Sequence, residues 1–325
     1  AQQARLIGDF LSEFPNVDRR FTNWLPGINW DYEFKGSKSI NITYRTEVRE
    51  PTIRQLQPVV DNSNPLNIYV GNPNLKPAYD HNVRLQGNWF DQFSFTSFFA
   101  FVNMRYTRNQ ITNARTINEN FQQVINPINV DRNLSLNGQA SFSTPLRFIK
   151  SKIDLRTNFN YNQGILFVNN IENDLDQLNG DLTIALSNRK QDVIAAEIGS
   201  TIGYTDSKYS VSKAFNQDFF NQAYYLDLSL NIKNKWTIQT DISHTVFPMV
   251  NFGAAQDFTL WQASVSRVLT KDEKLSVTFT AFDILNQNVG INRNATANFV
   301  QNENVLSLGR YFMLSFGYQL KRFGK

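Results

Sequence analysis

Apolar and polar positions alternate with a period of two along most of this 325-residue chain. In residues 39–48 every even position carries an apolar, aromatic or β-branched side chain, and every odd position carries a polar or charged one. Successive side chains of a strand point to opposite faces, so this pattern gives the segment one apolar and one polar face. Apolar residues at the spacing of a helix are almost absent, and the chain is therefore predicted to be all-β. The same alternation recurs at 152–161, 224–233, 236–243 and 275–280.

Thirteen strands are predicted on this pattern, and residues 1–14 are expected to supply either a fourteenth strand or part of a loop. Most of the strands are 12 residues or longer, whereas strands of soluble proteins typically have about 5–6 residues. A soluble β-sandwich or propeller is the alternative, but the strand lengths and the absence of an internal repeat disfavour it. The predicted strands span 21–34, 38–49, 80–91, 93–114, 121–145, 152–169, 177–188, 192–206, 221–233, 236–247, 255–270, 274–286 and 307–322.

The connections between these strands alternate between short and long. Short turns on one side and long loops on the other are typical of a barrel in the bacterial outer membrane. We therefore predict an antiparallel transmembrane β-barrel, with residues 1–325 forming a single transmembrane domain. Short connections are expected at 35–37, 91–92, 145–151, 188–191, 234–235 and 271–273, and long ones at 50–79, 114–120, 169–177, 206–220, 247–255 and 286–306.

Composition agrees with this prediction and excludes several other classes. Aromatic residues make up 14% of the chain and gather near predicted strand ends, as expected where a bilayer meets water. The chain contains no run of about 18 apolar residues, so no membrane-spanning helix is predicted. The 32 basic and 28 acidic residues nearly balance, without a basic block, so no nucleic-acid partner is expected. The absence of cysteine excludes disulfides and thiolate sites.

One long connection contains the stretch YVGNPNLKP, residues 69–77, directly before a predicted strand. This stretch resembles the TonB-dependent receptor family, and most closely its Bacteroidetes outer-membrane barrel branch, in which a GNPNLKPE-like segment precedes a barrel strand. Ala78 stands where that family usually has Glu. Three further segments also resemble sequences of this family: residues 126–146, residues 282–294 and the ending LGRYFMLSFGYQLKRFGK. The resemblance covers roughly residues 20–325.

The resemblance implies a 22-stranded barrel that holds a plug and imports a scarce nutrient, such as an iron chelate, an oligosaccharide or a peptide. The inner-membrane TonB complex supplies the energy by pulling on the plug. This chain contains no recognisable plug, so it is expected to be the C-terminal part of such a barrel. Two alternatives stay open: an accessory or structural barrel subunit of an outer-membrane complex, and a small passive porin.

The motif itself has a structural and a functional interpretation. Proline fixes φ, glycine permits unusual φ, and asparagine can bond its own backbone, which favours a rigid turn at the start of a strand. Contact with ligand or plug is the alternative interpretation. The motif residues are Gly71, Asn72, Pro73, Asn74, Leu75, Lys76 and Pro77.

No catalytic motif stands out, and we expect no enzyme activity, no cofactor and no metal site. The acidic segment 172–176 has spacing unlike a full calcium loop, so a solvated loop is favoured there. Aromatic residues at 121, 215, 219 and 220 are expected on outer loops, where they could stack on a ligand or on each other. Charged residues on the polar phase of the strands are the candidates for facing ligand or plug, or for simply solvating the lumen. They are Arg45, Arg49, Arg84, Asp154, Arg156, Asp227 and Asp241.

The expected partners are outer-membrane lipid and, through a plug absent from this chain, the TonB complex. A surface lipoprotein or another outer-membrane protein is a further expected partner.

Overall fold

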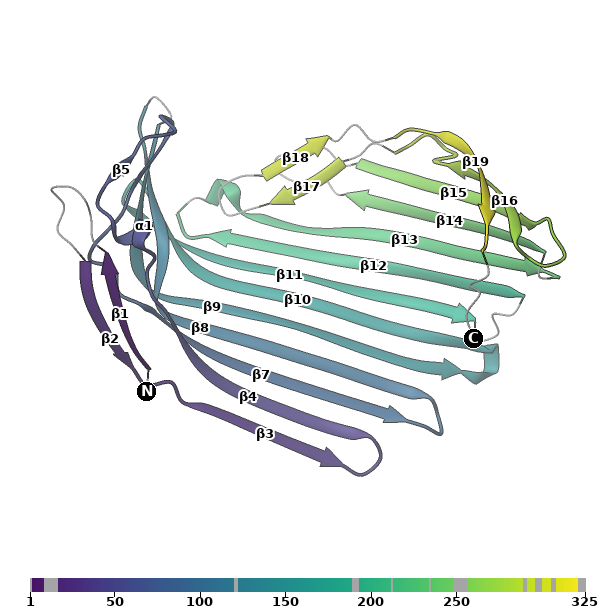
Figure 1. The fold of residues 1–325 in the computed structure, drawn as a ribbon, viewed down its shortest axis with the longest axis horizontal. Helices are drawn as coiled ribbons and strands as arrows, with labels where there is room; N and C mark the ends of the chain where they lie inside the picture. Colours follow the sequence, from purple (N-terminus) through teal and green to yellow (C-terminus); the bar gives the residue numbers. More distant parts are fainter. Residues whose placement is uncertain are drawn as a thin grey trace.

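A computed structural model of the protein describes residues 2–8, 17–119, 122–188, 193–211, 213–233, 235–247, 256–288, 291–295, 300–304 and 308–320. Most of these residues form one curved antiparallel sheet, in which each strand pairs with the next long strand along the chain (Figure 1). This result confirms the all-β, antiparallel barrel architecture predicted from the alternation. No helix among the described residues has the length and apolar character needed to cross a bilayer.

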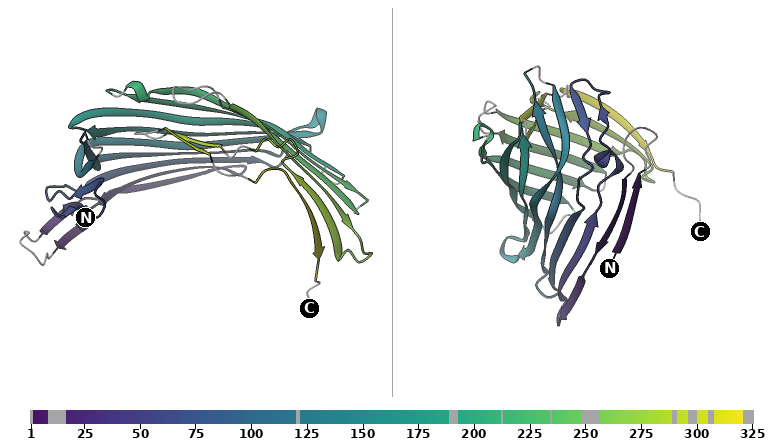
Figure 2. Two further views of the ribbon diagram at one scale, coloured as in Figure 1. Left: turned by 90° about the horizontal axis from the view of Figure 1, so that it is seen from above. Right: turned by 90° about the vertical axis from the view of Figure 1, so that its left-hand side faces the viewer.

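Thirteen strands of the described part follow one another across the sheet, as the alternation predicted. They are β3 (Gly27–Phe34), β4 (Lys38–Arg49), β7 (Ala78–Asp91), β8 (Thr96–Ile117), β9 (Gln123–Leu146), β10 (Ser151–Val168), β11 (Ile171–Asn188), β12 (Ile194–Tyr209), β13 (Gln217–Ile232), β14 (Trp236–Phe247), β15 (Gln256–Val268), β16 (Leu275–Phe282) and β19 (Tyr311–Tyr318). Figure 2 shows that the sheet bends into an open trough whose two edges are β3 and β19.

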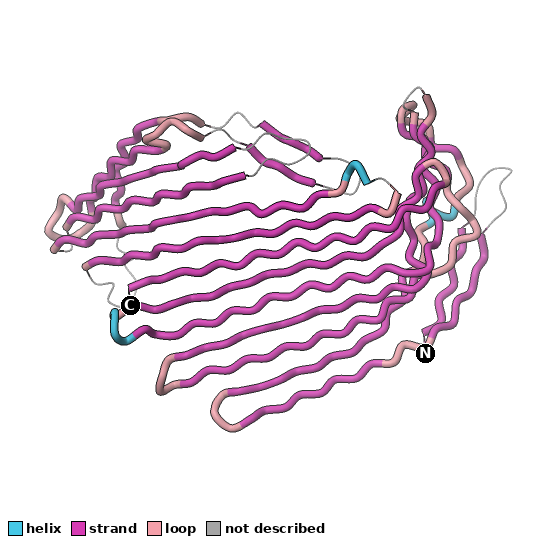
Figure 3. Tube along the Cα trace, turned by 180° about the vertical axis from the view of Figure 1, so that it is seen from behind, coloured by secondary structure: helices cyan, strands magenta, loops and turns pink. Residues whose placement is uncertain are grey.

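The short turns lie together at one end of the trough, at the right of Figure 1, where β19 also ends. They join β3 to β4, β7 to β8, β9 to β10, β13 to β14 and β15 to β16. The longer connections lie at the opposite end. The tube in Figure 3 shows how little helix the described residues contain: one turn, α1 (Ile53–Leu56), and two 3-10 turns, η1 (Arg147–Ile149) and η2 (Lys213–Phe215).

The pairing keeps apolar side chains on one face of the sheet. Trp30 lies opposite Ile42, Ile42 opposite Leu85, and Leu85 opposite Val102, so apolar side chains run in rows across neighbouring strands. No second layer covers this face among the described residues: Ile198 in the middle of the sheet is 56% exposed and Leu85 is 44% exposed. A soluble sandwich would bury such a face, whereas an outer-membrane barrel turns it toward lipid.

The N-terminal segment does not add a fourteenth strand to the main sheet. Instead, β1 (Gln2–Gly8) pairs with β2 (Val17–Asn23) in a separate two-stranded sheet. The strand predicted at 21–34 is also divided, because Pro26 cannot donate a backbone hydrogen bond to a ladder. The carbonyl group of Pro26 instead accepts hydrogen bonds from the backbone N–H and the hydroxyl of Thr46.

The predicted long loop at 169–177 is wrong, because β11 begins at Ile171, well before the expected strand start at residue 177. β10 and β11 contain 18 residues each, whereas β8 and β9, with 22 and 24 residues, keep nearly their expected lengths. Asn169 and Asn170, both with positive φ, close a two-residue turn between β10 and β11. At the outer ends of β10 and β11, both faces of the sheet contact water. No alternation of apolar and polar residues therefore marks these ends in the sequence.

The remaining long connections contain short elements of their own. The connection at 50–79 holds α1, β5 (Val60–Asp61) and β6 (Asn67–Val70), and the one at 286–306 holds the hairpin of β17 (Ile291–Ala295) and β18 (Val300–Asn304). Thr52 caps α1 through a reciprocal capping box with Gln55.

The GNPNLKP segment packs between α1 and the outer ends of β8 and β9. The N–H of Asn72 donates to the carbonyl of Gln55, and its side-chain amide donates to the carbonyl of Pro127. Leu75 is completely buried against Leu56, and together they form the core cluster of the described residues. The segment therefore anchors the outer connection to the barrel wall and sets where β7 begins.

Gly71 is the tightest point of this anchor. A Cβ at this position would lie 2.7 Å from the carbonyl oxygen of Arg54 and closer still to that of Gln57. We expect Gly71→Ala to displace α1, to destabilise the protein by about 1–3 kcal/mol, and to speed amide hydrogen exchange across residues 50–79. Gly87→Ala is the control, because its Cβ would meet only an ordinary contact at 4.0 Å. Equal exchange in both variants would contradict the anchoring role.

Candidate functional site

The polar face of the sheet is the candidate functional surface, because in an outer-membrane barrel this face lines the lumen. Alternation places Arg45, Arg84 and Asp227 on it, opposite Asn82, Thr43 and Asp241 of neighbouring strands. Polar side chains thus meet polar side chains across the ladder, and the charged groups are not scattered evenly. They gather in a basic region on β4, β7 and β8 and an acidic region on β12, β13 and β14.

The basic region surrounds a hollow of about 590 Å³. Arg45, Arg84 and Arg105 contribute to its lining together with amide side chains, and no Asp or Glu is among the described residues that line it. The guanidinium group of Arg84 donates to Gln86 at 3.1 Å and lies 5.6 Å from the ring centre of Phe101. Arg105 donates to Asn82 at 3.0 Å. These neutral partners orient the arginines but leave their charge available to an anionic group.

The acidic region surrounds a smaller hollow of about 260 Å³. Asp227 lies directly opposite both Glu197 on β12 and Asp241 on β14. Tyr225 donates its hydroxyl to Glu197 at 3.0 Å, and Gln262 donates to Asp241 at 3.2 Å. Like charges directly across a ladder are destabilising. The arrangement therefore favours a cationic or hydrogen-bond-donating group against this part of the wall.

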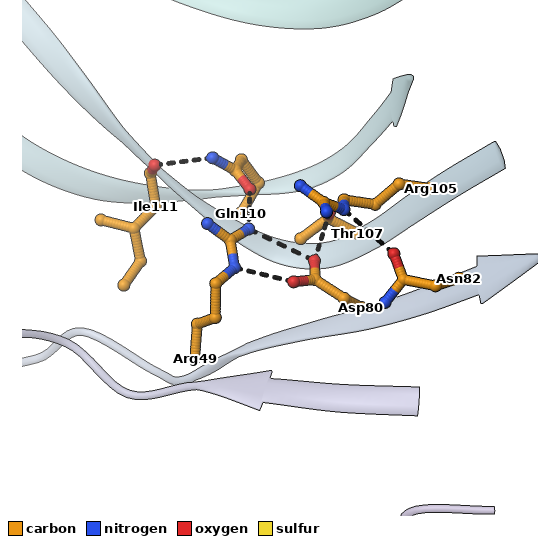
Figure 4. Close-up of polar contacts among 7 residues, drawn as sticks. All are labelled: Arg49, Asp80, Asn82, Arg105, Thr107, Gln110 and Ile111. Carbon is orange, nitrogen blue, oxygen red and sulfur yellow. Dashed lines mark hydrogen bonds and ion pairs between the residues drawn. The ribbon is translucent and has the colours of Figure 1, made fainter. Parts of the chain in front are cut away.

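A third cluster lies near the outer ends of β4, β7 and β8 (Figure 4). Arg49 donates from Nε and Nη2 to the two carboxylate oxygens of Asp80, at 2.7 and 3.2 Å. Thr107 donates to the same carboxylate at 2.5 Å, and Arg49 also reaches Gln110 at 2.9 Å. Asp80 is almost fully buried, whereas the Arg49 side chain is half exposed. This network joins three strands just below the GNPNLKP anchor.

Comparison with known protein families decides the broad class. The profile of the outer membrane protein beta-barrel family matches residues 1–318, nearly the whole chain. The chain belongs to this family. A search of curated proteins found no match. The family and the uncovered apolar face together place this outer-membrane barrel protein in the bacterial outer membrane, with its long connections outward and its short turns in the periplasm.

The structure brings only some of the predicted lumen residues of this barrel together. Arg45 and Arg84 share the basic hollow, and Asp227 and Asp241 share the acidic one. Arg49 belongs instead to the network around Asp80.

The other two predicted residues lie elsewhere on the polar face. Asp154 lies near the short-turn end, largely buried, with Lys152 at 2.9 Å. Arg156 lies opposite Ser141 and Thr183, between the basic and acidic regions.

Three important residues of the barrel wall were not predicted. Arg105 was missed because Phe99 and Phe101 share its face of β8 and obscure the alternation. Glu197 was missed because small residues flank it in β12. Alternation does place Asp80 at a polar position of β7, immediately after the motif. Its buried contact with Arg49 could not be predicted, because that contact depends on the register between β4 and β7.

The acidic segment and the aromatic residues also lie differently from the prediction. Residues 172–176 belong to β11 rather than to a loop, and no group of three potential metal-ligating side chains occurs among the described residues. Phe219 and Phe220 belong to β13, where Phe220 packs 4.6 Å from the ring of Tyr204. Phe121 and the side chain of Phe215 lie outside the described residues.

Ionised aspartates order the turns that lie outside the membrane. At the end of β7, a hydrogen bond from the Ser94 hydroxyl, followed by one from the Phe93 N–H, lowers the pKa of Asp91. In the last short turn, the Lys274 ammonium and then the Thr270 hydroxyl lower the pKa of Asp272. These contacts are therefore fully present at neutral pH and are lost as the pH falls through the lowered pKa values.

The Asp80 network provides a test of how the outer mouth is stabilised. Asp80→Asn keeps the shape of the side chain but removes the charge that Arg49 and Thr107 bind. We expect the free energy of unfolding of the detergent-solubilised barrel to fall by about 1.5–3 kcal/mol, the range for hydrogen bonds to charged groups. Urea titration followed by tryptophan fluorescence measures it.

The matched control is Asp61→Asn, which removes the carboxylate of the exposed Arg54–Asp61 pair. Exposed ion pairs contribute little to stability, so this variant should unfold at nearly the wild-type urea concentration. A loss of stability as large as that of Asp80→Asn would show that burial of Asp80 is unimportant.

Proposed function

We propose that this protein is part of the barrel of a TonB-dependent receptor that imports a scarce nutrient across the outer membrane. The observation that carries the proposal is the charged lumen wall, in which Arg45, Arg84 and Arg105 surround a hollow without a counter-charge among the described lining residues. Such a wall favours an occupant of complementary charge, either a plug or a captured solute. The GNPNLKP segment supports the same proposal through its resemblance to that receptor family.

The open edges of the sheet also support a larger barrel. β3 and β19 each have one neighbour in the sheet, so the outer side of each strand has no partner among the described residues. An unpaired edge is not stable in hydrocarbon, because its N–H and C=O groups cannot bond water there. In the proposed receptor, further strands pair with both edges and close the barrel around a plug. The import itself requires no covalent chemistry.

Two measurements on the protein as it is isolated from outer membranes test this proposal. Its intact mass should be well above that of the 325-residue chain, because the closing strands and plug belong to the same polypeptide. The purified protein should bind the periplasmic domain of TonB saturably and should not conduct ions steadily in a planar bilayer.

The outcomes separate the three candidate functions. Steady conductance without TonB binding would identify a passive porin. Stoichiometric co-purification with another outer-membrane protein, again without TonB binding, would identify an accessory subunit. Either result would overturn the importer proposal.

A further inference from the structure

The apolar face of the barrel ends, toward the long connections, in a cluster of aromatic side chains. His81 lies at its centre, with ring centres of Tyr79 and Tyr106 at 5.0 and 6.2 Å. The hydroxyl of Tyr44 lies 2.9 Å from Nδ1 of His81. Aromatic side chains with a polar tip prefer the boundary between acyl chains and headgroups. The cluster therefore marks the outer-leaflet interface on β4, β7 and β8.

The positions immediately beyond this boundary are basic. Arg108 follows Tyr106 by two residues on β8, so both side chains lie on the lipid-facing side. Arg132 of β9 lies directly opposite Arg108. Lys76 and Arg20 contribute, with Arg108, to the lining of a hollow of about 640 Å³ that also includes Tyr79 and His81. We call Arg20, Lys76, Arg108 and Arg132 the outer-rim basic cluster.

The depth of this cluster matches the level of lipid headgroups. The apolar row on β8 runs from Phe98 to Tyr106, which is eight residue steps. At about 3.3 Å per residue and a tilt of about 40°, these steps span about 20 Å, close to the apolar band of about 25 Å in outer-membrane barrels. Arg108, the next residue on that face, therefore lies at the edge of the hydrocarbon.

No ion pair among the described residues neutralises the outer-rim basic cluster. All four of its residues are exposed. Alternation places the acidic residues nearest to the cluster on β4, β7 and β9, namely Glu47, Asp80 and Asp131, on the polar phase, away from the cluster. Two arginines directly opposite each other repel unless an anion lies between them.

We propose that the outer-rim basic cluster binds the phosphate groups of a phosphorylated glycolipid in the outer leaflet. Guanidinium groups bind phosphate through paired, charge-assisted hydrogen bonds, which suits Arg108 and Arg132. Lys76 and Arg20 add positive charge beside them, and the aromatic cluster around His81 contacts the top of the acyl chains. The site lies outside the barrel and does not depend on what the lumen transports.

Lipid titration of the protein isolated from outer membranes and then delipidated tests this site. The probe is diphosphorylated lipid A in detergent micelles, with binding followed by native mass spectrometry. We expect saturable binding to the wild type, and at least about tenfold weaker binding to the double variant Arg108→Gln/Arg132→Gln, since two charge-assisted contacts are lost. The control is Arg115→Gln, which removes one positive charge from the same strand but on the opposite face, and should bind as the wild type does.

Two further binding measurements distinguish the phosphorylated lipid from other ligands. Dephosphorylated lipid A should bind at least about tenfold more weakly to the wild type, and inorganic phosphate at the same concentration should not displace lipid A. Equal binding of dephosphorylated lipid A, displacement by inorganic phosphate, or unchanged binding by the double variant would each overturn the proposal. Heat-modified migration on gels checks that the variants fold. If the double variant does not fold, Lys76→Gln replaces it, with weaker binding expected and unchanged binding contradicting the site.

Discussion

Backbone hydrogen bonding in a hydrocarbon environment is the constraint on which this structure depends. A strand in a bilayer has no water to satisfy its N–H and C=O groups, so every strand must pair with a neighbour on both sides. The antiparallel order from β3 to β19 satisfies this requirement for all the strands between them. Proline interrupts the ladder at the outer end of β3, where Thr46 bonds the Pro26 carbonyl instead. The hydrocarbon environment therefore determines the architecture as much as the side chains do.

Once the strands are paired, the register of the pairing determines which side chains lie on each face of the sheet. Because side chains alternate, a slip of one residue would turn the polar face toward lipid. The correct register places the apolar rows outward and gathers charges inward, basic on β4, β7 and β8 and acidic on β12, β13 and β14. It also places Arg108 and Arg132 outward, just past the aromatic boundary. The same alternation therefore produces a charged lumen and a basic rim on the outside.

The strands were predictable from sequence wherever one face meets lipid and the other meets water. The strand was not predicted where both faces contact water, as at Glu172 and Asp174 of β11, because polar residues occur on both faces there and the alternation disappears. The positions of Arg45 and Arg84 on the polar face followed from alternation alone. The proximity of both residues to Arg105, and the burial of Asp80 against Arg49, did not follow from alternation, because they depend on the register and the side-chain packing between neighbouring strands.

The central claim is that the apolar face of this outer-membrane barrel contacts lipid and the polar face does not. Single cysteines carrying nitroxide labels at residues 98–107 of β8 test it directly, since the chain has no cysteine of its own. In reconstituted bilayers, collisions with oxygen should peak at even positions from 98 to 106. Collisions with a water-soluble nickel complex should show no maxima at those positions. The opposite phase, or the absence of a two-residue period, would contradict the account.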